Sequence, residues 1–297
     1  MYDDLLVPVD GSDCSVAAAR EAAVVADAFD ARVRLLHVLS RSALRGEGVD
    51  PETADEATLR ELAADALDAA KRPLDASGVA TDVAVRVGDT TDEIRSSLAA
   101  GDADLIAMGT HGRTGVRRFL LGSVAERVVR TASVPVVTAR ARPVEDVGPY
   151  EEILLPTDGS EASRAGVERG LDVAEAFDAR VHVLYVVDRR LLSSGVDVGP
   201  ALSDVEARLR TRGDEAVASV ADRATERGVE ATTDVVEGIP HSRIRSAVTN
   251  RDVDFVAMGT HGKTGTNRWL TGSVAEQILR TSPGPVLTSR SEANGPE

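Results

Sequence analysis

The sequence predicts an α/β protein made of two tandem Rossmann-like domains, each an open five-stranded parallel sheet flanked by helices. The first observation is an internal repeat, in which Val7–Ser12 returns as Leu155–Ser160 and Gly109–Ser123 returns as Gly259–Ser273. The second is an alternation of short apolar runs with amphipathic stretches, which is typical of parallel sheets covered on both faces. The length of 297 residues accommodates two domains of common size.

The expected strands of the first half are short apolar runs bounded by glycine, proline or charged residues. They cover residues 5–9, 33–38, 80–87, 104–108 and 134–138. The longest expected helix carries apolar residues at helical spacing from Leu59 to Leu74. Shorter helices are expected to start at Thr90 and, in the second half, at Pro240. Such a doubly wound sheet binds ligands beyond the carboxyl ends of its strands, where the strand order reverses.

The matching segments also predict the domain boundaries. The expected parts are domain one at 1–142, a linker at 143–149, domain two at 150–291 and a polar tail at 292–297. The segments Ser40–Asp50 and Asp188–Pro200 follow the second strand of each half. We expect them to lie over the ligand crevices as candidate lids.

Composition and charge narrow the class of protein. The net charge of −15 argues against a general binder of nucleic acids or anionic membranes. Lysine occurs only at Lys71 and Lys263, and such an acidic, lysine-poor chain is typical of a halophilic archaeon, although a GC-rich genome would also favour arginine. No apolar run approaches the roughly 18 residues that span a bilayer, and the acidic start is unlike a secretory signal. We therefore expect a cytoplasmic protein in which the single Cys14 is structural.

The repeated glycine string predicts a phosphate site in each half. Both copies have the spacing G-x2-G-x9-G-S and follow a short apolar run that ends in Met108 or Met258. Glycine lets the backbone approach an anion, and a helix N-terminus offers unpaired N–H groups. Six loop residues, Gly109 to Gly112 with Thr114 and Gly115, are identical in the second copy, whereas neighbouring strand positions exchange one apolar residue for another. This identity favours a backbone or ligand role for the loop.

The first strand of each half ends in a carboxylate, at Asp10 and Asp158. If the first and fourth strands are neighbours, each carboxylate faces the same crevice as the glycine loop. It could then accept hydrogen bonds from a ribose or help to hold a divalent metal. The alternative is that Asp-Gly-Ser only forms a turn and a helix cap.

Other polar residues of the motif allow both structural and ligand roles. Ser123 and Glu126, like Ser273 and Glu276, have the spacing of a capping box. The loop histidines His111 and His261 could touch phosphate or act as a base, but a bond to nearby backbone is the simpler reading. The nearby cations could meet a triphosphate or lie in solvent, and they are Arg113, Arg118, Lys263 and Arg268.

Several known motifs are missing. Gly262-Lys263-Thr264 resembles the end of a Walker A loop, but the required earlier glycine is Ala257. The dinucleotide fingerprint, zinc spacings of Cys and His, and the G-x-S-x-G elbow are also absent from the sequence. Ordinary P-loop hydrolysis and hydride transfer therefore lose support.

These motifs together resemble the universal stress protein family, specifically its tandem-domain members with the ATP-binding glycine motif. The resemblance rests on Val7–Ser12, Leu36–Val38 and the glycine block, and on their copies in the second half. It implies a fold like that of adenine nucleotide alpha hydrolases, with ATP, alone or with magnesium, in each domain. It also implies that the last strands, 134–138 and 285–289, pair within the chain as a pseudo-dimer, and two chains could associate further as a homodimer.

The resemblance assigns binding residues by motif position. Asp10 would lie near the ribose, the backbone of Val38 would bond adenine, and the glycines and serine would hold phosphates. The implied binding residues are Pro8, Asp10, Val38, Met108, Gly109, Gly112, Gly122, Ser123 and Val124, and in the second half Pro156, Asp158, Val186, Met258, Gly259, Gly262, Gly272, Ser273 and Val274.

Three functions follow from these expectations. The leading hypothesis is an ATP-binding stress-response protein whose nucleotide controls conformation or partner choice. The second is a slow ATPase or nucleotidyl transferase, for which the sequence offers no evident general base beyond His111 and Asp10. The third is an interaction module without nucleotide, which the intact glycine spacing in both halves disfavours.

Overall fold

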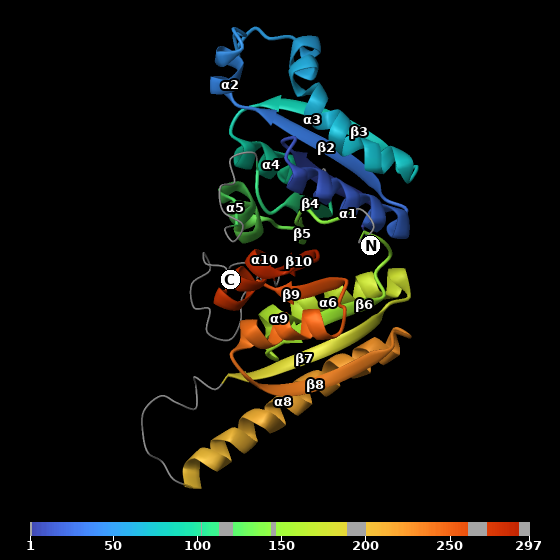
Figure 1. Ribbon diagram of the computed structural model, residues 1–297, viewed down its shortest axis with the longest axis vertical. Helices are drawn as coiled ribbons and strands as arrows, with labels where there is room; N and C mark the ends of the chain where they lie inside the picture. The colour runs from blue at the N-terminus through green and yellow to red at the C-terminus, as the bar shows by residue number, and fades with distance from the viewer. Residues whose placement is uncertain are drawn as a thin grey trace. The chain divides into compact units, whose positions relative to one another are not determined.

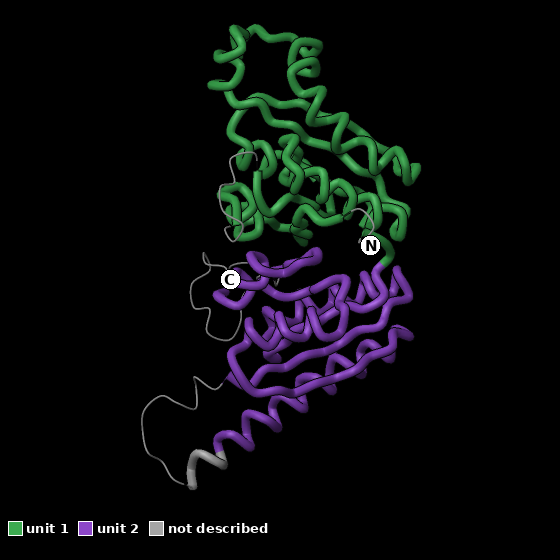
Figure 2. Tube along the Cα trace, in the orientation of Figure 1, with its two compact units in different colours: residues 1–149 green, residues 150–297 purple. Residues whose placement is uncertain are grey.

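The computed structural model describes residues 2–101, 103–112, 121–143, 147–188, 200–260 and 272–290, with side chains of the last long helix described from Val205 onward. The chain divides into two compact units, Met1–Pro149 and Tyr150–Glu297 (Figure 2). No helix among the described ranges is long and apolar enough to cross a membrane.

The first unit alternates strands and helices in the expected order (Figure 1). Its elements are β1 Asp4–Val9, α1 Asp13–Phe29, β2 Arg32–Leu39, α2 Arg41–Gly46, α3 Glu56–Ala76, β3 Thr81–Val87, α4 Thr90–Ala99, β4 Leu105–Gly109, α5 Ser123–Thr131 and β5 Val136–Ala139. All five expected strands form, and the helix predicted from Thr90 starts there.

The second unit repeats this order. Its elements are β6 Glu152–Thr157, α6 Glu161–Phe177, β7 Arg180–Asp188, α8 Pro200–Glu226, β8 Ala231–Gly238, α9 Pro240–Asn250, β9 Phe255–Gly259, α10 Ser273–Thr281 and β10 Val286–Ser289. Helix α9 has Pro240 in its first turn, as expected, because proline lacks the N–H that this turn leaves unpaired.

Both sheets are doubly wound, which confirms the predicted fold class. The strand order is β3-β2-β1-β4-β5 in the first unit and β10-β9-β6-β7-β8 in the second. Every pairing described within a unit is parallel. The order reverses between β1 and β4, where Leu5 pairs with Leu105, and between β6 and β9. In the first unit α1 packs against α3 and α4 packs against α5, so the two pairs cover the two faces of the sheet.

The first helix of each unit begins and ends for local reasons. Ser12 caps α1 by accepting a hydrogen bond from the Ser15 amide. The buried face of α1 consists mainly of alanines. The helix stops at Asp30, which adopts a left-handed conformation with φ 53°. Ser160 and Asp178 take the same parts for α6. The strand-end carboxylate therefore precedes a helix whose position is fixed at both ends.

Candidate nucleotide site

The strand-end carboxylate of the first unit takes part in the turn before α1. Asp10 Oδ1 accepts hydrogen bonds from the Ser12 amide at 3.0 Å and from its hydroxyl at 2.6 Å. The Ser12 hydroxyl also lies 3.2 Å from the carbonyl oxygen of His111, on the loop after β4. The expected turn and helix cap therefore form, and the Ser12 hydroxyl connects the end of β1 to the glycine loop at the point where the strand order reverses.

Two loop glycines stand where a side chain would collide. A Cβ on Gly109 would lie 2.7 Å from the carbonyl carbon of Cys14 in α1. A Cβ on Gly112 would lie 2.6 Å from Asp10 Oδ2, so the loop backbone passes directly over the carboxylate. Gly259 repeats the first contact, since its Cβ would meet the carbonyl oxygen of Ala162 at 2.1 Å. Close approach of the α1 and α6 backbones therefore explains the glycine that both halves carry at positions 109 and 259.

The predicted capping box at Ser123 is wrong. The N-cap of α5 is Gly122, which has φ −63° and ψ 148° and no side chain to cap the helix, while Ser123 is the first helical residue. Gly272 takes the same place before α10. The shift arises because the amides of both glycines bond the carbonyl oxygens of Thr110 and Thr260, at 2.7 Å each. The first N–H groups of α5 and α10 thus receive no side-chain cap, and such groups are suited to an anion.

A cavity of about 500 Å³ opens at this edge of the first sheet. Its walls include every site residue predicted in the first half: Pro8, Asp10, Val38, Met108, Gly109, Gly112, Gly122, Ser123 and Val124. They come from the ends of β1, β2 and β4, the glycine loop and the first turn of α5. One cavity thus combines a carboxylate, an uncapped helix N-terminus and the end of β2.

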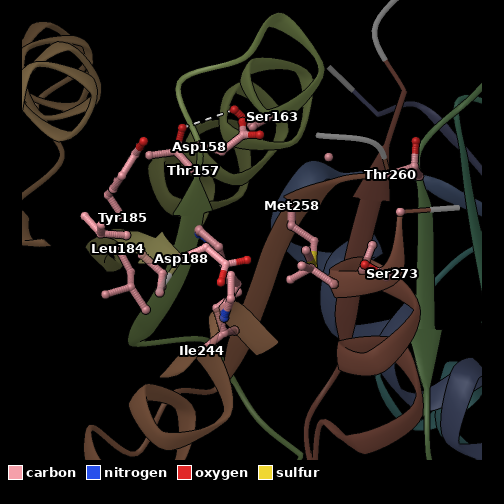
Figure 3. A pocket seen from close by; sticks show the side chains of 18 of the residues that line it. Thr157, Asp158, Ser163, Leu184, Tyr185, Asp188, Ile244, Met258, Thr260 and Ser273 are labelled. Carbon is pink, nitrogen blue, oxygen red and sulfur yellow. Dashed lines mark hydrogen bonds between the residues drawn. The ribbon is translucent and has the colours of Figure 1, made fainter. Parts of the chain in front are cut away.

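The second unit has a smaller cavity at the same place, about 240 Å³ in volume. Its walls include Pro156, Asp158, Val186, Met258, Gly259, Gly272, Ser273 and Val274. Figure 3 shows Leu184 and Tyr185 across this cavity from Met258 and Ser273. Asp158 repeats the Asp10 turn, with Oδ1 at 2.9 Å from the Ser160 amide and 2.6 Å from its hydroxyl. Gly262 lies outside the described residues.

The two cavities differ in side chains that sequence reasoning did not single out. His37 lines the first, and its Nδ1 lies 2.8 Å from the carbonyl oxygen of Val9, so Nδ1 carries the proton. Tyr185 takes this position in the second unit, where burial, and then the charge of Asp158, raise the pKa of its phenol. Ile244 of α9 adds apolar surface. His37 and Tyr185 occupy the same position in the internal repeat, and comparing the two copies at this position could have found the difference.

His111 lies in the wall of the first cavity. We expected this histidine to bond nearby backbone, but its Nδ1 lies 3.0 Å from the hydroxyl of Thr110. Its Nε2 is buried without a hydrogen-bond partner among the described residues. Burial, and then the charge of Arg140, lower the pKa of this imidazole. The ring is therefore neutral near pH 7. His261 and the four cations considered with the loop, Arg113, Arg118, Lys263 and Arg268, fall outside the described ranges.

The first candidate lid reaches the cavity. Ser40 caps the short helix α2, and both Ser40 and Ala43 line the cavity. In the second unit Asp188 lines the cavity, while 189–199 are not among the described residues. Within the part of the chain that the structure describes, no group of three or more His, Cys, Asp or Glu residues is placed to hold a metal ion.

Comparisons with known proteins agree with this architecture. A universal stress protein of Methanocaldococcus jannaschii is 36% identical over 138 residues, which cover 46% of this chain and 81% of that protein. A universal stress protein of Mycolicibacterium smegmatis is 25% identical over 293 residues, or 96% of each chain. The crystal structure of a universal stress protein from Archaeoglobus fulgidus has a TM-score of 0.70 with 21% identity, covering 97% of this chain and 98% of that one.

The last of these matches shows the shared fold, and the second extends over nearly the whole length of both chains. The family model described as the universal stress protein family matches residues 1–140 and again 149–290. This chain therefore belongs to the universal stress protein family and carries two of its domains in tandem.

Proposed function

We propose that each domain binds an adenine nucleotide, ATP, in the cavity at the switch point of its sheet. The observation that carries this proposal is the convergence of a strand-end carboxylate and an uncapped, glycine-preceded helix N-terminus in one cavity. A helix N-terminus favours negative charge, and a carboxylate is a good acceptor for ribose hydroxyls. The repetition of both features in the second domain supports two sites per chain.

The lining residues fit the parts of a nucleotide. The backbone at Val38 and Val186 lies near the carboxyl end of β2 and β7, beside apolar side chains, which suits a base. Asp10 and Asp158 would accept from the ribose, and the amides at the starts of α5 and α10 would hold phosphates. Magnesium, if it accompanies the nucleotide, would be held chiefly by the phosphates and water. The first cavity, at about 500 Å³, is within the usual size of ligand sites.

We infer a regulatory role for the bound nucleotide in the stress response. The short helix α2 borders the first cavity through Ala43, so a ligand there contacts the segment expected to act as a lid. Ordering of this segment would give free and bound forms with different surfaces for partners. A slow ATPase or nucleotidyl transferase is the second candidate. It is favoured by the neutral imidazole of His111, whose Nε2 is buried without a partner among the described residues.

Further expectations from the sequence remain part of this proposal. We propose the same boundaries as before: domain one at 1–142, a linker at 143–149, domain two at 150–291 and a tail at 292–297. The matches to the family model end at residues 140 and 290, close to the ends of the two domains. Pairing of the two domains through their last strands, a further homodimer, a cytoplasmic location and a halophilic archaeal source also remain proposals. The acidic charge of −15 supports the last of these and recommends purification at high salt.

The test is to purify the protein, extract it and identify any bound nucleotide with its stoichiometry. Titration of ATP into the nucleotide-free protein gives affinity and site number. The matched variant is Asp10→Asn with Asp158→Asn, which keeps an oxygen acceptor for the two serines while removing the charge. We expect about two ATP per chain and weaker binding in the variant. Absence of both bound and titratable nucleotide would sink the proposal, and magnesium-dependent turnover lost in the variant would favour the enzyme.

A further inference from the structure

A second cavity of the second domain lies outside the nucleotide site, between α6 and α8. Its volume is about 500 Å³, and it is walled by the β6–α6 loop, the first turns of α6 and one face of α8. Thr157 and Ser163, whose hydroxyls are 3.1 Å apart (Figure 3), separate it from the cavity that contains Asp158. We call this cavity the α6–α8 groove.

Arginine dominates the charge of the groove. Arg164, Arg212 and Arg223 line it, and Glu215 is the one acidic residue in its described lining. Arg164 and Arg212 form no ion pair with any described residue. Arg223 bonds Glu168 and the carbonyl oxygen of Ser219, and burial, followed by the charges of Arg164 and Arg227, lowers its pKa. The groove therefore contains two guanidinium groups whose donors no described residue uses in an ion pair, beside the ion-paired Arg223.

The first domain has no counterpart of this cluster. When Ser160 is aligned with Ser12, Arg164 corresponds to Val16. When Gly228 is aligned with Gly78, Arg212 corresponds to Leu62 and Arg223 to Pro73. In that domain the two helices α1 and α3 pack closely. These substitutions place charge where the first domain places apolar surface.

Ion pairs replace this packing in the second domain. The guanidinium of Arg227 bonds Glu168 at 2.6 Å and Asp172 at 2.7 Å, and Arg223 bonds Glu168 as well. These contacts join α6 to α8 at one end and leave the groove between their other turns. The groove is therefore bounded on one side by ion pairs that hold the two helices together, and it is not a gap between loosely packed helices.

We propose that the α6–α8 groove binds a small phosphorylated anion, held by Arg164 and Arg212 with the Ser219 hydroxyl as a further donor. The planar fork of guanidinium matches two oxygens of a phosphate, and such charge-assisted pairs are the strong ones. Ser219 lies on the groove, and its hydroxyl makes no hydrogen bond with a described residue. The volume exceeds that of a single ion, which favours a diphosphate or a phosphate ester.

The experiment titrates pyrophosphate into the full chain and follows backbone amides by NMR. The site is located by the amides of Ser160, Arg164 and Ser219 against those of Gly272 and Ser273 in the nucleotide cavity. This comparison keeps the proposal separable from nucleotide binding, since either set can shift without the other. Parallel titrations with inorganic phosphate and glycerol phosphate distinguish a free anion from an ester.

The test variant is Arg164→Gln with Arg212→Gln, and the control is Arg208→Gln with Arg245→Gln. The control removes the same charge from exposed arginines that do not line the groove. We expect the test variant to weaken pyrophosphate binding at the α6 and α8 amides at least tenfold and the control to change it less than twofold. Urea midpoints check that both variants fold, and Arg164→Lys with Arg212→Lys, which keeps the charge without the fork, should give an intermediate loss.

Two outcomes would overturn the proposal. Equal losses in the test and control variants would mean that pyrophosphate responds only to overall charge. Shifts confined to the amides at the start of α10, or no shifts at all at millimolar pyrophosphate, would mean that the groove binds no phosphate.

Discussion

The uncapped start of α5 can be tested by giving it the cap that it lacks. Gly122→Asp places a carboxylate at the N-cap, where φ −63° and ψ 148° suit any L-residue. The added Cβ would lie 3.2 Å from the Thr110 carbonyl oxygen and 3.5 Å from His111 Cα. These contacts are tight and ask only for small adjustments, so the variant should fold.

The expected effects on stability and on nucleotide binding have different sizes. An aspartate in place of glycine at an N-cap stabilises a helix by only a few tenths of a kcal/mol, and the tight Cβ offsets part of this gain. A bound phosphate, however, would meet a carboxylate in its own place. At a separation of about 4 Å and an effective dielectric constant of about 20, the repulsion is about 4 kcal/mol per pair of unit charges. That corresponds to a loss of about three orders of magnitude in affinity for ATP.

The assay is calorimetric titration of ATP, with urea denaturation as the measure of stability. Ala57→Asp is the matched control, since it adds the same charge to the exposed first turn of α3, away from the cavities. Gly122→Asp should remove one of two binding events, Gly272→Asp the other, and the double variant both. Unchanged ATP affinity in a folded Gly122→Asp protein would refute the view that this helix N-terminus holds the phosphates.

Three further predictions concern stability, each measured by urea denaturation. Gly166→Ala would put a Cβ 2.0 Å from a backbone carbonyl carbon of β9, so we expect a loss of about 3 kcal/mol or more, whereas Gly46→Ala, with no atom within 4 Å, should be neutral or slightly stabilising. Glu21 is 1% exposed and forms an ion pair with Arg142 at 2.8 Å. Glu21→Gln breaks this pair and should lower the free energy of unfolding by about 3 kcal/mol, and a loss below about 1 kcal/mol would contradict this. Burial lowers the pKa of His182, so stability from its neutral form is present above its ordinary pKa of about 6.5 and is lost as the pH falls below it. His182→Asn should flatten the stability profile below that pH, and an unchanged slope would contradict the assignment.

The fold could be predicted because its determinants are local or repeated. Strands such as Leu5–Val9 and Leu105–Met108 are apolar runs too short for helices, and each is bounded by turn residues. The doubly wound class followed from fold rules for alternating β and α elements, whereas the adjacency of the first and fourth strands was only a condition, which the pairing of Leu5 with Leu105 meets. Given that adjacency, the meeting of Asp10 with the glycine loop follows, as expected from the sequence.

The start of α5 could not be predicted by the same means. Ser123 and Glu126 have the spacing of a capping box, and nothing local distinguishes this frame from one shifted by a residue. A distant contact decides the frame, because the Gly122 amide bonds the carbonyl oxygen of Thr110 and so fixes the chain before the helix. The preference of serine for N-caps is weaker than this constraint. The result strengthens the case for an anion site, since a true cap would have used the donors.

The arginines of the α6–α8 groove were also missed, for a different reason. On an isolated helix, Arg212 and Arg223 are read as solvated surface, and their meaning depends on a second helix that is about 50 residues earlier in the chain. Comparison of the halves offers the missing signal. The glycines and the serine of the loop motif are identical in both domains, which argues for a shared task, whereas the helices exchange Val16 and Leu62 for Arg164 and Arg212. Val16 is partly buried and Leu62 is 36% exposed, so the exchange replaces apolar surface with two arginines that have no ion-pair partner among the described residues. Arginines without ion-pair partners are expected where a ligand supplies the missing negative charge, and this is why the second domain is the place to look for a task that the first does not share.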